Sequence, residues 1–325
     1  MSKAARGDIC VSSGGIWPQA RDVNGGRMIA SLNIDPGRPV LIAGPTASGK
    51  SALALAIAEK WDGIVINADA LQVYDCWQVL TARPDPGELA RAPHALYGHV
   101  GRQRAYSVGA WLRDVARVLA DNGQKLPIVV GGTGLYISAI VNGLSDIPEI
   151  PVEVRETAEH LRNKHGFQHL LKALAANDPA TAARIDTQNP VRVQRAWEVW
   201  RATGHGLAHW QEVRPVPLLA RADCNAFLID APKEWLNPRI ARRFREMLEN
   251  GALAECEAAR ENWNPALPSS RAIGARELMA YLDGDRDLAT AISDAEIATR
   301  QYAKRQRSWF RARMTDWTRV PPPAE

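Results

Sequence analysis

The residues best suited to chemistry form a glycine-rich loop at positions 44–51. Its sequence, GPTASGKS, fits the pattern GxxxxGK[ST] at every specified position and lies between a predicted strand at 40–43 and a predicted helix at 52–60. Glycines let the backbone wrap closely around an anion, so that consecutive N–H groups and the helix N-terminus face it. We therefore expect a phosphate-binding loop made of Gly44, Pro45, Thr46, Ala47, Ser48, Gly49, Lys50 and Ser51. In it, Lys50 reaches the terminal phosphate and the Ser51 hydroxyl helps to hold Mg²⁺.

A carboxylate follows the next predicted strand. The apolar run at 64–66 leads into Asn67, Ala68 and Asp69, so Asp69 emerges near the phosphate loop at the C-terminal edge of the sheet. Its type and place fit a magnesium ligand, a general base or a helix cap. The apolar strand at 128–130 ends in Gly-Gly-Thr-Gly, where a nucleotide-hydrolysing protein would typically carry an Asp for magnesium. The phosphate loop alone therefore does not identify the reaction.

These groups must be positioned by an α/β core. The predicted strand at 40–43, helix at 52–60 and strand at 63–67 form a βαβ unit of roughly 30 residues, which predicts a parallel sheet with helices on both faces. A helix at 106–119 and strands at 126–130 and 224–231 continue the pattern, and helices return over 237–315. The expected fold class is α/β, with a P-loop NTPase-like core and a helical insertion lobe.

The expected organisation has three parts. Residues 1–36 lack sustained periodicity and predict a flexible N-terminal leader. Residues 37–146 and 217–325 form the core with its C-terminal helices. Residues 147–216 form the helical insertion, in which the patterns at 153–164, 169–176, 179–185 and 190–203 are helical and separated by Pro and Gly.

Positive charge is concentrated near the C-terminus. The chain carries a net charge of +4. Residues 300–319 contain a single acid, Asp316, and seven cations: Arg300, Lys304, Arg305, Arg307, Arg311, Arg313 and Arg319. The aromatic residues Trp309, Phe310 and Trp317 are interleaved with these cations, a combination that suits a phosphate backbone and exposed bases. A solvated helix whose aromatic residues dock on the core has the same pattern, so charge alone leaves both interpretations open. A second basic cluster, Arg239, Arg242, Arg243 and Arg245, lies on a predicted helix that runs to Leu248.

Several classes of protein are excluded by pattern. No apolar run approaches the length of about 20 residues that a membrane span needs, and residues 1–36 do not resemble a secretory signal. Cys10, Cys76, Cys224 and Cys256 are scattered without a CxxC pair, so neither structural zinc nor a disulfide framework is expected. These observations predict a cytoplasmic protein without a membrane partner.

Seven segments, taken in order, resemble the tRNA dimethylallyltransferase family, also called the tRNA isopentenyltransferase family. They cover about residues 38–315 and comprise 44–51 (GPTASGKS), 67–74 (NADALQVY), 81–84 (TARP), 131–136 (GGTGLY), 189–196 (NPVRVQRA), 272–278 (AIGAREL) and 299–310 (TRQYAKRQRSWF). One such match would be weak, whereas seven in the same order are specific.

The resemblance implies a reaction. A dimethylallyl group would pass from dimethylallyl diphosphate to the exocyclic amine of the adenosine beside a tRNA anticodon, in a monomeric enzyme that uses Mg²⁺. The phosphate loop would then hold the diphosphate of the prenyl donor, with Lys50 and Arg243 stabilising charge on the leaving group. Asp69 matches the family's proposed base, and Thr133 matches the threonine whose hydroxyl holds the target region. The adenosine would be flipped out of its stack to enter the pocket.

The same resemblance implies a set of tRNA contacts. A pocket for the target base would be lined by Asp69, Ala70, Leu71, Gln72 and Thr133. The helical insertion would clamp the tRNA through Arg155, Val191, Arg192, Val193, Gln194 and Arg195. Further contacts would come from Ala272, Ile273, Gly274, Ala275, Arg276 and Glu277, and from Lys304, Arg305, Gln306, Arg307, Ser308, Trp309, Phe310 and Arg311.

Three alternatives share part of this pattern. A small-molecule kinase would use the same loop for ATP, but it leaves the basic C-terminal helix and the helical insertion without a purpose. A prenyltransferase acting on AMP or ADP shares the donor site. A non-catalytic RNA-binding module would make the phosphate loop vestigial, although Lys50 and Ser51 are both present.

Overall fold

The computed structural model describes residues 29, 32–212 and 215–323. Its core is one parallel β-sheet. The strands are β1 (Val40–Ala43), β2 (Gly63–Asn67), β3 (His94–Ala95), β4 (Leu126–Gly131), β5 (Asn225–Ile229) and β6 (Thr318–Val320). Their order across the sheet is β3-β2-β4-β1-β5-β6, and every pair is parallel. The predicted α/β fold with a parallel sheet is confirmed, and β1 sits at the centre with the phosphate loop at its C-terminal end.

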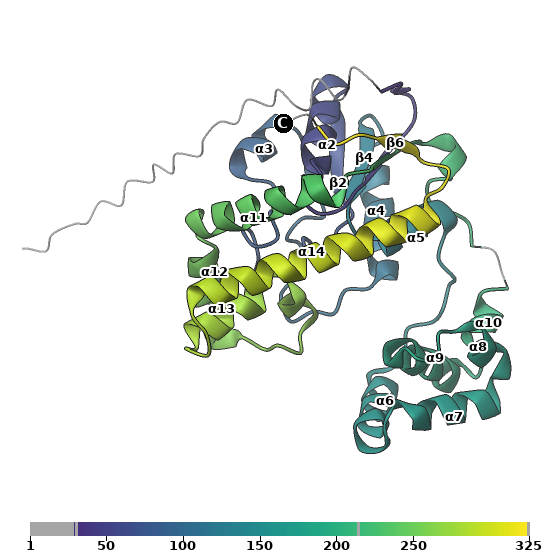
Figure 1. Cartoon of the computed structure of the whole chain (residues 1–325). Coiled ribbons are helices and arrows are strands. Elements are labelled where there is room, and N and C mark those ends of the chain that lie inside the picture. Colours follow the sequence, from purple (N-terminus) through teal and green to yellow (C-terminus); the bar gives the residue numbers. More distant parts are fainter. Residues whose placement is uncertain (1–28, 30–31, 213–214, 324–325) are drawn as a thin grey trace, which may run out of the picture.

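Helices cover the sheet and continue beyond it (Figure 1). Those of the first half are α2 (Lys50–Lys60), α3 (Pro86–Arg91), α4 (Val108–Asp121) and α5 (Gly134–Asn142). After β5 come α11 (Lys233–Glu249), α12 (Ala252–Ala259), α13 (Ala275–Leu282) and the long α14 (Leu288–Arg313). Short 3₁₀ turns lie at Arg221–Asp223, Arg260–Asn262 and Pro268–Arg271.

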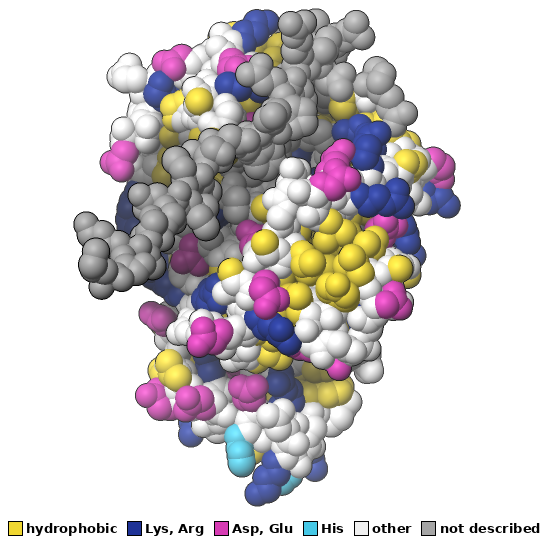
Figure 2. All heavy atoms as spheres, turned by 90° about the vertical axis from the view of Figure 1, so that its left-hand side faces the viewer, with side chains coloured by type: hydrophobic (Ala, Val, Ile, Leu, Met, Phe, Trp, Pro, Cys, Tyr) yellow, Lys and Arg dark blue, Asp and Glu magenta, His cyan; other side chains and the backbone are white. Residues whose placement is uncertain are grey.

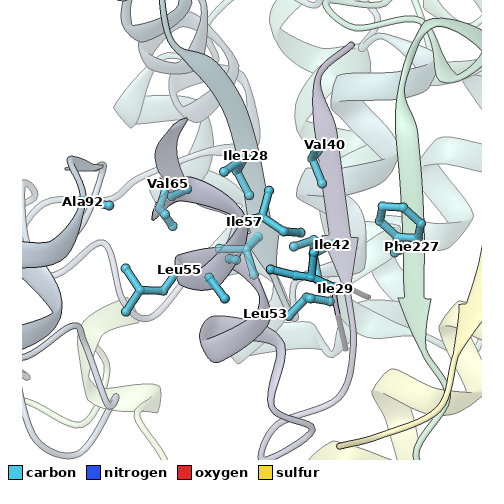
Figure 3. Packing of buried hydrophobic residues seen from close by; sticks show 14 of the residues in the cluster. Ile29, Val40, Ile42, Leu53, Leu55, Ile57, Val65, Ala92, Ile128 and Phe227 are labelled. Carbon is cyan, nitrogen blue, oxygen red and sulfur yellow. The ribbon is translucent and has the colours of Figure 1, made fainter. Parts of the chain in front are cut away.

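The strands are almost wholly apolar because both faces of the sheet are buried. On one face, Leu53 and Ile57 of α2 pack against Val40 and Ile42 of β1 and against Ile128 of β4 (Figure 3). The opposite face is covered by α4, α5 and the end of α14, which supply Trp111, Val115, Ile137, Ile140, Phe310 and Met314. The alternation of side chains along β1 therefore joins two hydrophobic layers.

A separate group of helices lies between α5 and β5 in the sequence. It comprises α6 (Val152–His165), α7 (Phe167–Asn177), α8 (Pro179–Arg184), α9 (Pro190–Thr203) and α10 (Leu207–Trp210). Figure 1 shows these helices standing apart from the sheet. They have their own buried cluster of Ala158, Leu170, Val193 and Trp197. Asp178 and Asn189 cap α8 and α9 by accepting hydrogen bonds from first-turn N–H groups.

Several elements differ from the sequence-based expectation. The short α3, β3 and β6 and the helix α5 were not expected, because two- and three-residue strands carry little periodicity of their own. Helix α11 begins at Lys233 and contains Pro238, whereas the pattern predicted a start at 237. Most of the predicted leader, residues 1–28 and 30–31, lies outside the described residues, but Ile29 is buried in the core with Leu32 and Ile34 packed beside it. The packed structure therefore includes residues that the prediction assigned to the leader.

In the described part of the chain, no helix combines the length and the apolar character required to cross a membrane.

Replacement of Phe310 tests the packing of α14 on the sheet. Phe310 is 1% exposed and belongs to the same buried cluster as Trp111 and Ile137. We expect Phe310→Ala to lower the free energy of unfolding by about 3–5 kcal/mol, because it leaves a cavity in a close-packed core. The matched control is Arg311→Ala, an exposed neighbour that should change stability by less than about 0.5 kcal/mol. Equal stability of both variants in urea denaturation would contradict the packing role.

Candidate active site

The phosphate loop connects β1 to α2 through a tight turn. Gly49, the residue before the helix, has a φ of 87°, and Ala47 has a φ of 62°, so two residues adopt the left-handed conformation. Helix α2 begins at Lys50, and the first N–H groups of a helix have no intrahelical partner. These donors and the helix dipole favour an anion at this point. The structure thus places residues 44–51 in the arrangement that the sequence motif requires.

Lys50 supplies the positively charged side chain of this loop. Its Nζ donates a hydrogen bond to the Pro45 carbonyl oxygen at 3.3 Å. Burial lowers the pKa of Lys50 to about 8, while the negative charge of Asp69 raises it and the positive charge of Arg243 lowers it further. An anion bound in the loop would supply the missing negative charge and favour the protonated form.

A cavity of about 560 Å³ extends from the phosphate loop along α11 and the loop that precedes α3. Arg239, Arg242 and Arg243 of α11 line it together with Lys50 and Asp69. Arg239 Nε donates to the Ala47 carbonyl oxygen at 3.3 Å and so ties α11 to the phosphate loop. Burial lowers the pKa of Arg243, and the carboxylates of Asp69, Glu246 and Glu88 oppose that shift. The cavity therefore gathers several cations around a single loop of N–H donors.

Asp69 is held by a network at the end of β2. Its N–H donates to Asn67 Oδ1 at 2.8 Å, and its Oδ1 accepts from the N–H of Leu71 at 3.0 Å. Asn67 is fixed in turn, since its Nδ2 donates to the Leu96 carbonyl oxygen and its own carbonyl oxygen accepts from Trp111 Nε1. The hydrogen bond from Leu71 to Asp69 Oδ1 fixes the turn. Asp69 lines the cavity at this point.

Thr133 supports the Asp69 turn from the short connection between β4 and α5. Its Oγ1 accepts a hydrogen bond from the N–H of Ala70 at 2.9 Å, and its N–H donates to the Ala68 carbonyl oxygen. Glycine is required before it, because a Cβ at Gly131 would lie 2.1 Å from the Ala68 carbonyl oxygen. The structure therefore brings Lys50, Asp69, Thr133 and Arg243 together around the C-terminal edge of β1, β2 and β4.

A second, smaller cavity of about 90 Å³ adjoins the first at Asp69 and Arg243. Its lining is mostly apolar and comes from several elements: Leu71, Leu80, Ile240, Phe244, Met247 and Ile273. Tyr302 of α14 also lines it, and burial raises the pKa of its phenol well above the usual range. A small apolar space beside a polyanion site and a carboxylate suits a short hydrocarbon that is attached to a phosphate.

One wall of both cavities depends on a residue that sequence reasoning missed. The carboxylate of Glu255 in α12 accepts hydrogen bonds from the N–H groups of Gln78, Val79 and Leu80. Gln72 holds the next part of the same loop, because its Nε2 donates to the carbonyl oxygens of Thr81 and Ala82 at 2.9 Å each. No motif marks Glu255, since its partners are backbone groups about 175 positions earlier in the chain. Leu80, Phe244 and Tyr302 were also missed, because they line the small cavity only where their separate elements pack together.

The predicted RNA-contacting residues of α14 fall on two faces. Lys304, Arg305, Ser308 and Arg311 are exposed, and Arg307 and Trp309 are half-buried. Phe310 and Gln306 are buried, so in this structure their side chains are not available to RNA. The aromatic residues Phe310 and Trp317 dock on the core, as the packing interpretation expected. RNA contact by the exposed cations stays a prediction.

The helical lobe carries its predicted RNA-contacting residues away from the cavities. Arg155, Val191 and Arg192 are exposed, whereas Val193 is buried in the lobe's own core. Gln194 is occupied within the lobe, because it accepts from Arg162 Nη1 at 2.7 Å and donates to Glu198 Oε1 at 2.8 Å. Arg195 lies 3.9 Å from Glu198. Figure 1 shows the lobe apart from the sheet, and none of these residues lines either cavity at Asp69.

The predicted contacts at 272–277 span the turn before α13 and its first residues. Ala272, Gly274 and Ala275 are buried, and Ile273 lines the small cavity. Glu277 accepts a hydrogen bond from the N–H of Gly274 at 2.9 Å, and Arg276 is exposed and donates to the Pro265 carbonyl oxygen. This segment builds a wall of the site, and Arg276 is the member most accessible to a large ligand. Leu71 and Ala70 are half-buried next to it around Asp69.

Positive charge does not coat the molecule uniformly. On the face drawn in Figure 2, Lys and Arg side chains alternate with Asp and Glu and surround an apolar area. The cations that are concentrated without acidic neighbours are those of the last turns of α14, as the sequence indicated. A polyanionic partner is therefore expected at α14 more than on that face.

The comparisons with known proteins agree with this arrangement. A family model described as IPP transferase matches residues 72–313, which begin just after Asp69. The chain is 58% identical over 294 residues to the tRNA dimethylallyltransferase of Dinoroseobacter shibae, covering 90% of this chain and 97% of that protein.

Two solved structures are similar over most of the chain. The tRNA isopentenylpyrophosphate transferase of Bacillus halodurans has a TM-score of 0.61 at 30% identity, covering 87% of this chain and 89% of that one. A eukaryotic dimethylallyltransferase, solved in structures of its action on tRNA, has a TM-score of 0.76 at 27% identity over 88% of this chain and 74% of that one.

The lowered pKa of Lys50 predicts a pH dependence of anion binding. In the free protein, Lys50 loses its proton as pH rises through about 8, whereas Lys50 keeps its proton when an anion is bound. The affinity for pyrophosphate should therefore fall above pH 8. The fall should approach about tenfold for each further pH unit. Titration calorimetry from about pH 7 to about pH 9.5 measures this fall in affinity. Lys50→Arg is the matched control, because it stays charged; identical pH profiles for the two proteins would refute the assignment.

Proposed function

The chain belongs to the IPP transferase family, and we propose that it transfers a dimethylallyl group from dimethylallyl diphosphate to the exocyclic amine of the adenosine beside a tRNA anticodon. The observation that carries this proposal is that the phosphate loop, the half-buried Arg243 and the Asp69 carboxylate line one continuous site, with a small apolar cavity beside them. The phosphate loop and Arg243 match the charge of the donor, the apolar cavity matches its hydrocarbon, and Asp69 matches the proton of the acceptor amine.

The diphosphate of the donor binds at the phosphate loop. The loop N–H groups and Lys50 face its oxygens, and Arg239 and Arg243 add positive charge from α11. The Ser48 hydroxyl, buried in the loop, has no hydrogen-bond partner among the described residues and is available to an anion. As the allylic C–O bond breaks, negative charge grows on the diphosphate, and these preorganised cations stabilise it.

Magnesium fits this site as a companion of the diphosphate. The Ser51 hydroxyl is exposed at the first turn of α2 and offers the hard oxygen that Mg²⁺ prefers. Among the described residues there is no cluster of three or more His, Cys, Asp or Glu that would hold a metal ion, so diphosphate oxygens and water would complete its shell. Bound there, the ion would neutralise part of the leaving-group charge.

The five-carbon group occupies the small apolar cavity. Leu80, Phe244 and Met247 line it, so a hydrocarbon loses contact with water there without leaving a polar group unsatisfied. The reacting carbon then lies between the phosphate loop and Asp69, because both cavities share Asp69 and Arg243.

Asp69 accepts the proton of the acceptor amine. An adenine amine is a weak nucleophile and must lose a proton as its new bond to carbon forms. The adenine reaches the cavity by leaving its stack, and Thr133 holds the Asp69 turn in place through the N–H of Ala70. The new N–C bond forms, the C–O bond breaks, and diphosphate leaves with the bonding electron pair.

The tRNA binds along α14 and the helical lobe. The exposed Lys304, Arg305 and Arg311 supply phosphate contacts, and Arg155 and Arg192 extend the cationic surface to the lobe. The lobe, residues 147–216 of the proposed domain division, clamps the RNA. The enzyme acts as a monomer in the cytoplasm, where tRNA is modified.

Two other activities fit part of the site. A kinase for a small molecule would use the phosphate loop, but it gives no use to the apolar cavity beside Asp69. Prenyl transfer to AMP or ADP uses the same donor site, but it leaves the cations of α14 without a ligand. The deciding assay measures labelled dimethylallyl incorporation into tRNA, AMP and ADP, with ATP hydrolysis as a control. Incorporation only into free nucleotides, or phosphoryl transfer from ATP, would refute the proposal.

Removal of the Asp69 carboxylate should separate chemistry from binding. We expect Asp69→Asn to lower kcat by at least about 100-fold, since general-base catalysis typically contributes that much or more. Affinity for tRNA should stay within a few-fold, because Asp69 is one contact of many. Single-turnover assays and filter binding measure the two quantities. Near-normal turnover of Asp69→Asn would remove Asp69 as the base.

Neutralising the exposed cations of α14 should change the salt dependence of tRNA binding. Replacing Lys304, Arg305 and Arg311 with Gln should weaken binding and lower the slope of log affinity against log salt by roughly one for each lost phosphate contact. The control is Arg245→Gln, an exposed arginine of α11 that lies 3.9 Å from Glu296. An unchanged slope in the triple variant would mean that these cations are not RNA contacts.

A further inference from the structure

Gln306 joins two loops of the active site from the inner face of α14. Its Oε1 accepts a hydrogen bond from the N–H of Thr46 in the phosphate loop at 2.8 Å. Its Nε2 donates to the carbonyl oxygen of Gly132, directly after β4, at 2.9 Å. The side chain is 6% exposed, so both bonds are largely shielded from water. A single amide thus connects segments that lie 260 and 174 positions away from it in the chain.

The second of these loops lies next to the reacting groups. A Cβ placed on Gly132 would lie 3.5 Å from Asp69 Oδ2, so the Gly132 backbone borders the carboxylate. Tyr302, one turn before Gln306, lies beside Gln306 and Thr133, whose side chains partly offset the raised pKa of its buried phenol. Thr133 in turn accepts from the N–H of Ala70, next to Asp69. One face of α14 therefore connects the donor loop to the turn that carries Asp69.

The chemistry of the position calls for an amide. Its two partners are a backbone N–H and a backbone carbonyl oxygen, so the side chain must accept at one end and donate at the other. A carboxylate accepts but does not donate, and an apolar side chain of the same length does neither. Buried backbone groups without a partner are costly, so loss of the amide should let the loops shift.

We propose that Gln306 is a positioning residue that holds the phosphate loop in register with Asp69, and not an RNA contact. This inference rests on the proposed function, because the register matters for bringing the donor carbon to the acceptor amine. It reassigns one residue of the segment 304–311 that the family resemblance associated with tRNA. The exposed Lys304, Arg305 and Arg311 of the same helix retain that association.

The two interpretations differ in what the variant Gln306→Met changes. Methionine keeps the length and removes both hydrogen bonds. A positioning role predicts a fall in kcat/KM for dimethylallyl diphosphate of about 10- to 100-fold at saturating tRNA, since small misplacements of reacting groups have effects of that size. The dissociation constant for tRNA and its salt slope should stay unchanged within about twofold, because no phosphate contact is lost.

Lys304→Gln is the matched variant on the outer face of the same helix, and it should weaken tRNA binding. A raised dissociation constant for tRNA in Gln306→Met, with kcat/KM for the donor unchanged, would overturn the proposal. A purely structural role would also overturn it: thermal unfolding would then shift while kcat/KM per folded molecule stayed at the wild-type value.

Binding of inorganic pyrophosphate gives a test that is independent of prenyl transfer. Calorimetry on the full chain should show weaker pyrophosphate binding in Gln306→Met than in the wild type, because the N–H groups of the loop are no longer held. If the wild-type chain does not prenylate tRNA, the proposed function fails, yet this comparison still decides whether Gln306 orders the loop.

If Gln306→Met does not give folded protein, Gln306→Asn replaces it. Asparagine keeps both polar groups but is one methylene shorter and cannot reach both loops at once. The same loss of donor kcat/KM and of pyrophosphate affinity supports the proposal, and wild-type values for both quantities overturn it.

Discussion

The site depends on positive charge held partly away from water around the phosphate loop and the N-terminus of α2. Burial lowers the pKa values of Lys50 and Arg243, and the nearby Asp69 carboxylate opposes the shift for both. Partly desolvated cations of this kind interact strongly with an incoming polyanion, because the surrounding medium screens them weakly. The same cations would stabilise the charge that grows on a departing diphosphate, so donor binding and catalysis draw on one arrangement.

That arrangement is held by elements that lie far apart in the sequence. The parallel sheet brings the ends of β1, β2 and β4 to one edge, where they present the phosphate loop, Asp69 and Thr133. Helix α11 adds the arginines, and α12 fixes the loop at 78–80 through Glu255. Helix α14 then closes the site through Gln306 and Tyr302. Each helix therefore supplies one wall, and the cavities exist only where these walls meet.

Helix α14 serves two purposes on two faces. Its inner face packs Phe310 into the core and bonds Gln306 to the active-site loops. Its outer face presents Lys304, Arg305 and Arg311 to solvent. Core packing and RNA contact therefore do not exclude each other on this helix, because the helical period places the packing residues and the charged residues on opposite sides. A ligand bound along the outer face lies one helix diameter from the donor loop, about 10 Å.

The sequence by itself determined the phosphate loop, the central strands β1, β2 and β4, and the segments that resemble the family, because each is encoded by contiguous residues with a local physical requirement. Strand β1 and strand β2 have the predicted bounds, and Lys50, Asp69, Thr133 and Arg243 meet around one edge of the sheet. Only the tertiary structure decided that Phe310 and Gln306 face inward, that Glu255 holds a loop of the site, and that an apolar cavity adjoins Asp69. These features arise from contacts between residues more than 150 positions apart, and no local pattern in the chain records which distant backbone groups a side chain will meet.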